Sequence, residues 1–331
     1  TTMFRYTMIL IVLILSITEG GAVQPYQPVQ PDPFLEPWRW QFFDELNGQG
    51  LKCLAEDSSG NMWFGIDEGV VRYDGINWTT YRPEDGLHGA PVITLRAGRD
   101  GDVFAGTAQG ISRFKDGAWQ RIFPPEGEMA WEVNGLTQTS DGSLWAATQL
   151  GPLQLKGGIF TLYHREKTQA ALADSAAYLR FVIIPETALP SEGDFPAFDV
   201  FEGRDGMMWF SCEGRAAGMG RRGDEILRCD LQKVLANDPE AWRLYTEADG
   251  LDSGRRARII QTRDGVIWSA SDQGRAGVNR FDGKAWSHIR LSDLGGSNYN
   301  PSILETRDGT VWVSGAFSTF VHIFRDGRWH I

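Results

Sequence analysis

A short pattern occurs six times in this chain: an Asp-Gly or Ser-Gly pair with an aromatic residue three positions after the glycine. The glycines of the six copies are Gly60, Gly101, Gly142, Gly206, Gly265 and Gly309. Successive glycines are 41, 41, 64, 59 and 44 residues apart. A repeat of about 40 to 45 residues is typical of the blades of a β-propeller. The spacing therefore predicts a repeat protein of that class.

Each copy contains the signals of four short strands. In the first copy, apolar segments at 51–55, 62–66, 70–73 and 77–81 alternate with turns, two of which contain Gly60 and Gly75. Asp-Gly pairs favour tight hairpin turns, and β-branched and aromatic residues favour strands. The sequence predicts an all-β propeller over 38–331, with four-stranded antiparallel blades sealed by aromatic side chains. The six predicted blades cover about 51–81, 91–123, 132–162, 198–245, 256–290 and 301–331.

The repeat carries a resemblance to a known family. The first copy contains Trp63 followed by Phe-Gly, then Gly69-Val, the segment Arg72-Tyr-Asp-Gly75, and Trp78. This string resembles the two-component regulator propeller repeat, and the match covers roughly residues 38–331, with departures in copies three and four. The resemblance implies a non-catalytic, ligand-sensing extracytoplasmic propeller of a bacterial histidine kinase or hybrid two-component system. It also implies an output domain beyond residue 331, and it allows homodimers of the full-length receptor.

The N-terminal region has the features of an export signal. Arg5 precedes the apolar run 8–15, and small residues follow at 20–22. The run is too short for a membrane-spanning helix, which needs about 20 residues. We expect a signal peptide at 1–22, a proline-rich linker at 23–37, and a periplasmic or extracellular protein. The alternative is that the apolar run is a buried strand or a short anchor.

The segment 38–43 resembles the fourth strand of a blade without the other three. Its residues Trp40 to Phe43 match the outer strands at 78–81 and 242–245. Propellers close by letting one terminus complete the blade begun by the other, which removes exposed sheet edges. Six copies plus this strand lead us to expect part of a seven-bladed ring. A closed six-bladed ring is the alternative.

Composition excludes some functions. A net charge of −11 argues against nucleic-acid binding, which depends on Lys and Arg neutralising phosphates. Three cysteines do not suggest a disulfide framework, and we expect free thiols. No motif for a cofactor, a metal or a catalytic residue is present. The aspartates of the six turns are expected to stabilise those turns. Arg72, Arg113, Arg228 and Arg280, at one matched position, are expected to make a structural contact between blades.

The places where the spacing lengthens indicate a binding site. Extra residues at 163–198, 213–224 and 272–277 are all expected on the face opposite the Asp-Gly turns, here called the insertion face. The candidate ligand-binding residues there are Arg215, Arg221, Arg222, Arg255, Arg256 and Arg275. Arginines bind carboxylates and sulfates through forked hydrogen bonds, so the expected partner is a small molecule such as an oligosaccharide or an anion. Drift of tolerant loops and solvated arginines are the alternative explanation. Besides a sensor, a secreted propeller lyase or hydrolase and a protein-binding scaffold remain possible functions.

Overall fold

The computed structural model describes residues 42–164, 178–185, 188, 195–215, 222–236, 238–251, 255–272, 277–290, 299–316 and 321–330. Residues 45–331 contain one compact unit, the propeller body, which is distinct from 1–44. The predicted signal peptide, the linker and residues 38–41 lie outside the described residues. Of the strand predicted at 38–43, Phe42 and Phe43 are described, and neither is in a strand. The strand predicted for ring closure is therefore not observed at those two positions.

The described residues of the body form six sheets, which we number as blades 1 to 6 in chain order. Blade 1 contains β1 (Cys53–Glu56), β2 (Met62–Ile66), β3 (Gly69–Tyr73) and β4 (Trp78–Tyr81). Blade 2 contains β5 (Val92–Ala97), β6 (Val103–Thr107), β7 (Ile111–Lys115) and β8 (Ala118–Phe123). Blade 3 contains β9 (Val133–Gln138), β10 (Leu144–Thr148), β11 (Gly151–Lys156), β12 (Ile159–His164) and β13 (Leu179–Ile183). Blade 4 contains β14 (Ala197–Glu202), β15 (Met208–Arg215), β16 (Arg222–Cys229) and β17 (Trp242–Tyr245). Blade 5 contains β18 (Arg255–Gln261), β19 (Ile267–Asp272), β20 (Gly277–Phe281) and β21 (Trp286–Arg290). Blade 6 contains β22 (Tyr299–Glu305), β23 (Val311–Ala316), β24 (His322–Arg325) and β25 (Arg328–His330). Short helices are η3 (Asp44–Leu46), η4 (Pro83–Asp85), α3 (Leu231–Leu235), η6 (Pro239–Ala241) and η7 (Glu247–Asp249).

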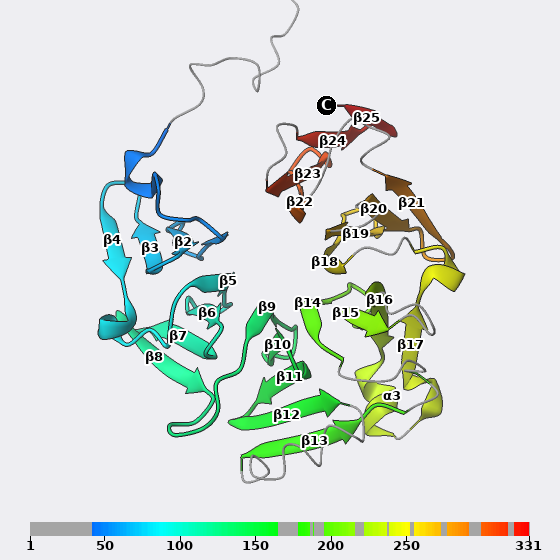
Figure 1. Ribbon diagram of the computed structural model, residues 1–331, viewed down its shortest axis with the longest axis horizontal. Coiled ribbons are helices and arrows are strands. Elements are labelled where there is room, and N and C mark those ends of the chain that lie inside the picture. The colour runs from blue at the N-terminus through cyan, green and yellow to red at the C-terminus, as the bar shows by residue number, and fades with distance from the viewer. Residues whose placement is uncertain are drawn as a thin grey trace, which may run out of the picture. The chain divides into compact units, whose positions relative to one another are not determined.

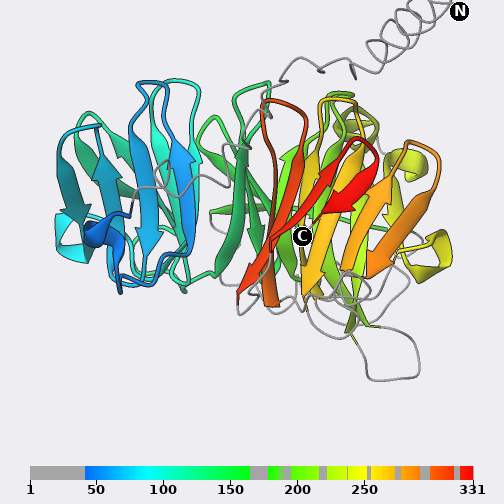
Figure 2. The same cartoon turned by 90° about the horizontal axis from the view of Figure 1, so that it is seen from above.

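The blades follow one another around a centre, with the first strand of each blade innermost (Figure 1). Inner strands of successive blades pack together from β1 to β5, β9, β14, β18 and β22. Among the described residues, β22 and β1 are not one of these packed pairs, and blades 6 and 1 stand apart in Figure 1. In Figure 2 the strands of the blades run between the two faces of the body. The predicted all-β propeller architecture is confirmed for six blades.

The hydrophobic core lies between neighbouring blades. The aromatic residue three positions after the turn glycine packs on the next blade, as Trp63 does on Phe114 of blade 2 at 4.8 Å between ring centroids. The matching pairs further round are Trp209 with Phe281 at 5.8 Å, and Trp268 with Phe324 at 5.1 Å. Each such ring buries an area worth about 2 kcal/mol or more. The predicted aromatic seal between blades is confirmed.

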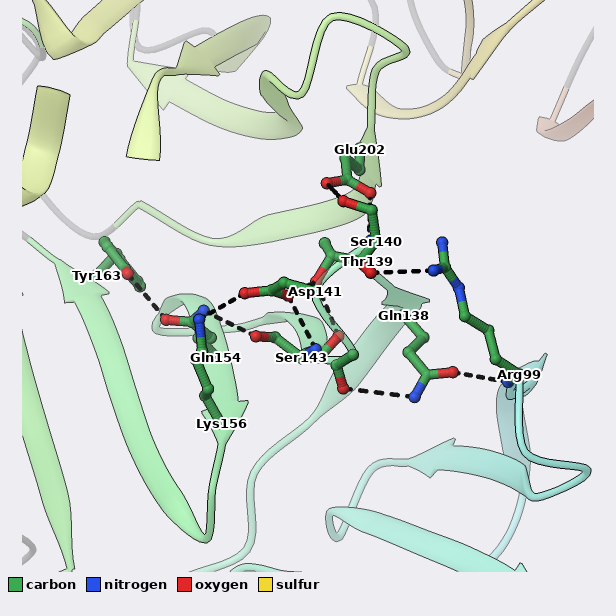
Figure 3. Close-up of polar contacts among 11 residues, drawn as sticks. Arg99, Gln138, Thr139, Ser140, Asp141, Ser143, Gln154, Lys156, Tyr163 and Glu202 are labelled. Carbon is green, nitrogen blue, oxygen red and sulfur yellow. Dashed lines mark hydrogen bonds and ion pairs between the residues drawn. The ribbon is translucent and has the colours of Figure 1, made fainter. Parts of the chain in front are cut away.

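A hydrogen-bonded latch also joins neighbouring blades on the Asp-Gly face. The residue two positions before a turn glycine donates its backbone N–H to the side chain four positions before the next turn glycine. Arg99 donates to Gln138 at 2.8 Å, and Ser140 donates to Glu202 at 2.6 Å (Figure 3). The remaining latches are Arg204 to Gln261 and Arg263 to Glu305. The latch therefore connects blades 2 to 6 in one chain.

Two blades depart from the four-stranded plan. Blade 3 has a fifth strand, β13, which pairs in parallel with β12 at its outer edge. Part of the 163–198 insertion is therefore a strand along the blade's outer edge, whereas the sequence predicted a loop on the insertion face. In blade 4, the third-to-fourth-strand connection contains α3 and η6, and Asp230 caps α3 by accepting from the N–H groups of Gln232 and Lys233. Among the described connections on the Asp-Gly face, this one is longer than the others.

Candidate functional site

The predicted arginine cluster lies at the ends of strands in blades 4 and 5. Arg215 and Arg222 are backbone partners at the far end of the β15–β16 hairpin. Arg255, the first residue of β18, is the partner of Asp272, and Arg256 follows it. Arg221 and Arg275 lie outside the described residues. The structure thus brings two of the six arginines opposite each other, and ligand binding by the six stays a prediction.

A second set of residues comes from one matched position on the inner strands. The residue seven positions before each turn glycine lies on the innermost strand of its blade and is Cys53, Thr94, Gly135, Asp199, Arg258 or Ser302. Four of these residues are small and uncharged. Only blades 4 and 5, which also carry the long insertions, have charged residues at this position. The sixfold repetition is therefore broken at the centre of the ring by Asp199 and Arg258.

The Arg258 side chain reaches across the ring. Its Nη1 donates to the backbone oxygen of Asn134 in blade 3 at 3.0 Å, and a second bond to the Phe198 oxygen of blade 4 measures 3.5 Å. The Asn134 side chain donates in turn to the Ala197 oxygen at 3.2 Å. Arg258 belongs to blade 5, so these bonds place its guanidinium beside the inner strands of blades 3 and 4.

The Asp199 carboxylate is hydrogen-bonded to the backbone of blades 4 and 5. Its oxygens accept the backbone N–H groups of Ile259 and Val200, each at 3.0 Å. Burial raises the pKa of Asp199, although the charges of Arg258 and Arg96 and these hydrogen bonds act in the opposite direction. Hydrogen bonds therefore connect the inner strands of blades 3, 4 and 5 at these positions. We call Asn134, Asp199 and Arg258 the central cluster.

Blades 1 and 3 leave room for this cluster. A Cβ on Gly135 would lie 2.9 Å from Oδ1 of Asp199, so the absence of a side chain allows blade 4 to approach blade 3. Burial raises the pKa of the Cys53 thiol to about 12, against the effect of the Arg258 charge. A thiol with that pKa is neutral at physiological pH and is a poor nucleophile. Cys53 is therefore a small, uncharged side chain at its matched position on the inner strand.

A surface cavity of about 340 Å³ lies on the Asp-Gly face between blades 5 and 6. Its walls include Arg263, Arg307 and Glu305. Arg263 uses its backbone N–H on Glu305 and its side chain on the backbone oxygen of Arg307, so these polar groups belong to the latch. Blade 4 repeats this arrangement with Arg204, which binds Gln261 and the Arg263 oxygen. A contact repeated from blade to blade is explained by structure, and we do not treat this cavity as the functional site.

The matched arginines of the third strands make structural contacts, and each contact lies within one blade. Arg72 lies 5.5 Å from the Trp63 ring centroid of the same blade, and Arg228 lies at the same distance from Trp209. Arg113 and Arg280 make the same contact with Phe104 and Trp268 at 5.9 Å. The expectation of a contact between blades was wrong, because residues paired on adjacent strands share a face. Stacking on the ring shields the aromatic layer.

The turn aspartates hold their turns. Asp57 accepts the N–H groups of Ser59 and Asn61 at 2.9 and 3.0 Å and the indole N–H of Trp63 at 2.8 Å. None of Cys53, Cys212 and Cys229 forms a disulfide in the described part of the chain, as expected. Among the described residues, no group of three or more His, Cys, Asp or Glu side chains is arranged to hold a metal ion. In the same part of the chain, no helix is long and apolar enough to span a bilayer.

The fold defines the class of the protein as a β-propeller. The chain is similar to PorZ of Porphyromonas gingivalis, described as an essential surface component of the type-IX secretion system, with a TM-score of 0.53, 14% identity and coverage of 83% of this chain and 40% of that one. It is also similar to the extracellular domain of a protein from B. thetaiotaomicron described as a hybrid two-component system, with a TM-score of 0.49, 12% identity and coverage of 85% and 39%. A gluconolactonase from Xanthomonas campestris has a TM-score of 0.40, 11% identity and coverage of 85% and 74%.

The similarity to PorZ shows the fold alone, because the identity is 14%. The chain spans about two fifths of the length of the first two proteins. No family model matches the chain, and no curated protein matches it.

Sequence reasoning missed the central cluster. Its three residues come from three blades, and Arg258 and Asn134 are 124 positions apart. A usable signal was present in the comparison of the six copies position by position. Seven residues before the turn glycine, two copies differ in charge from the others.

Proposed function

We propose that the chain is an extracytoplasmic propeller that senses a ligand for a signal-transduction protein and has no catalytic role itself. The repeat residues from Trp63 to Trp78 support the family resemblance, and the propeller fold agrees with it. The observation that carries the proposal is the broken symmetry at Asp199 and Arg258. Repeated contacts hold a propeller together, whereas a binding site needs side chains that differ between blades. Blades 4 and 5 provide both the charged centre and the extended hairpin that ends at Arg215.

The proposal includes export from the cytoplasm. The apolar run at 8–15 with Arg5 before it supports a signal peptide over 1–22, and the prolines after residue 23 support a linker. A periplasmic or extracellular location would bring the propeller into contact with small molecules from outside the cell. The partner is a small molecule, an oligosaccharide or an anion. Full-length receptors would associate as homodimers.

A screen of ligands against the purified chain tests the sensing role. Oligosaccharides and organic acids are added one at a time, and the thermal unfolding midpoint is measured together with the products left in solution. A ligand that binds only the folded state adds about 2.7 kcal/mol of stability at a hundredfold excess over its dissociation constant, and this raises the unfolding midpoint. We expect such a shift without turnover. Turnover of any compound would instead support the secreted lyase or hydrolase, and the absence of any shift would favour a protein-binding scaffold.

We also propose that a further four-stranded blade packs between blades 6 and 1. The aliphatic residue six positions before the turn glycine is buried against the preceding blade in blades 2 to 6. Leu95 of blade 2 is 7% exposed, whereas Leu54 of blade 1 is 59% exposed. At the opposite end, Trp312 of blade 6 is half-buried, although the matching aromatic residues of the other five blades are buried. The face of blade 1 with Leu54 and the face of blade 6 with Trp312 thus have the residues that pack on a neighbouring blade elsewhere in the ring.

The latch supports the same proposal. Glu56 of blade 1 occupies the acceptor position of the latch, and the backbone N–H of Arg307 in blade 6 occupies the donor position. Within the described ranges neither makes the latch hydrogen bond that Glu202 and Arg263 make. A further blade would supply a Glu or Gln for Arg307 and a backbone N–H for Glu56. It would complete a seven-bladed ring.

A further inference from the structure

One matched position on the third strands is buried in all six blades. It is the backbone partner of the residue that follows the turn aromatic residue, and its occupants are Val71, Ser112, Leu153, Leu227, Asn279 and His322. Each of these six residues is at most 3% exposed. Among the six, His322 of blade 6 is the residue whose side chain can take up a proton near neutral pH.

His322 differs from the other polar residues at this position in its hydrogen bonds. The Ser112 hydroxyl accepts the backbone N–H of His88 at 2.7 Å, and the Asn279 side chain donates to the Ser269 hydroxyl at 3.2 Å. Neither ring nitrogen of His322 has a hydrogen-bond partner among the described residues. A buried polar group without a partner lowers stability, so the stability of the blade does not account for a histidine here.

The His322 side chain lies in the interface that holds blade 6 on blade 5. His322 and Phe324 are two residues apart on β24, so their side chains share one face of the strand. Phe324 packs on Trp268 of blade 5 at 5.1 Å between ring centroids. Val313, the backbone partner of His322, belongs to the same apolar cluster as Val278 of blade 5. The imidazole is therefore directed toward apolar side chains of the neighbouring blade.

The groups around His322 do not compensate a charge on its ring. Strand β23 has no titratable residue, and the charged or titratable residues on β24, β25, β19 and β20 are Arg325, Arg328, His330, Asp272 and Arg280. Within the described part of the chain, none of them forms a hydrogen bond or an ion pair with His322. Burial lowers the pKa of His322, and no neighbouring charge contributes to the shift. A protonated ring would be a buried cation without a partner, which is costly in an apolar interface.

We infer that His322 makes the contact between blades 5 and 6 sensitive to acid. At neutral pH the uncharged ring is compatible with the apolar interface. At acidic pH the ring takes up a proton, and the charge is stable only where water reaches it. A fall in pH therefore opens the interface and exposes its apolar cluster. The inference goes beyond the proposed ligand sensing and does not depend on it.

Opening of the interface takes up one proton at His322. In the open or unfolded chain His322 has its ordinary pKa of 6.5, whereas burial lowers its pKa in the folded chain. The stabilisation by the uncharged ring is thus complete above about pH 6.5 and is lost as the pH falls toward the lowered folded value. Within that range the equilibrium constant for opening rises by up to about tenfold per pH unit.

Amide hydrogen exchange of the full chain, corrected for the intrinsic rate at each pH, tests the inference. Between about pH 6.5 and about pH 5.5 we expect the opening constant of β24 amides to rise severalfold, up to about tenfold, and that of β11 amides in blade 3 not to follow. His322→Leu should abolish the rise in β24. Leucine is the residue of blades 3 and 4 at this position, so the variant should fold. A rise in β24 that persists in His322→Leu, or an equal rise in β11 and β24 of the wild type, would overturn the inference.

Two further variants control for titration elsewhere and for folding. His330→Gln removes an exposed imidazole from the same blade and should leave the rise in β24 unchanged. His322→Asn copies the residue of blade 5 at this position and should abolish the rise, as His322→Leu does. Loss of the rise in His330→Gln would assign the acid response to the wrong histidine and overturn the inference. If both His322 variants failed to fold at neutral pH, the imidazole would be a packing requirement, and the inference would also be wrong.

Discussion

The backbone N–H and the hydroxyl of Ser140 both donate to the carboxylate of Glu202, each at 2.6 Å, and this pair joins blade 3 to blade 4. The matching acceptors in blades 3 and 5 are the amide oxygens of Gln138 and Gln261. The position thus requires an acceptor, and it does not require a charge. Figure 3 shows the Ser140–Glu202 pair beside the Arg99–Gln138 pair of the preceding latch.

The latch leads to a first prediction at Glu202. Replacing Glu202 by Ala should lower the free energy of unfolding by about 1 kcal/mol, because the exposed N–H of Ser140 can bind water instead. Glu202→Gln keeps an acceptor and should change stability by only a few tenths of a kcal/mol. Urea denaturation of the two variants measures the difference. Equal destabilisation by Gln and Ala would show that the carboxylate charge, and not the hydrogen bond, holds the blades together.

The second prediction compares two matched leucines. Leu95 is packed against blade 1, so Leu95→Ala should cost about 2 to 4 kcal/mol of stability. Leu54→Ala in the chain of residues 1–331 should cost less than about 1 kcal/mol, since Leu54 is largely exposed. In a chain that extends beyond residue 331 and forms the proposed further blade, Leu54→Ala should cost as much as Leu95→Ala. A small effect in both chains would contradict the further blade.

The comparison of sequence and structure separates what repeats from what does not. Trp63 and its five matched aromatic residues were predictable because the same turn and strand chemistry recurs in every blade. The central cluster was not predicted, because Arg258 and Asn134 come together only when the ring brings distant blades to one centre. Strand β13 was missed for a different reason. Its residues Leu179–Ile183 lie in an insertion with no counterpart in other copies, and no turn signal there marks a fifth strand.

The third prediction concerns acid. Hydrogen bonds from the Thr306 hydroxyl and the Thr310 N–H hold the pKa of Asp308 at about 2, below its ordinary value of 3.8. Because the unfolded chain takes up this proton first, the stabilisation by Asp308 is complete above about pH 3.8 and is lost as the pH falls through about 2. The unfolding midpoints of wild type and Asp308→Asn should therefore differ at pH 5 and converge toward pH 2. A constant difference over that range would contradict the lowered pKa.

The fourth prediction concerns the space that blade 3 gives to Asp199. A methyl group on Gly135 would lie 2.9 Å from Oδ1 and 3.0 Å from Cα of Asp199, so the inner strand of blade 4 has to move. Gly135→Ala should lower the free energy of unfolding by about 1 to 3 kcal/mol, the usual cost of overpacking. Ser302→Ala, at the matched and exposed position of blade 6, should change stability by less than about 0.5 kcal/mol. Urea denaturation of both variants measures these effects. Equal stability of Gly135→Ala and wild type would show that blades 3 and 4 can separate at the centre without cost, and the fixed position assigned to Asp199 would then be wrong.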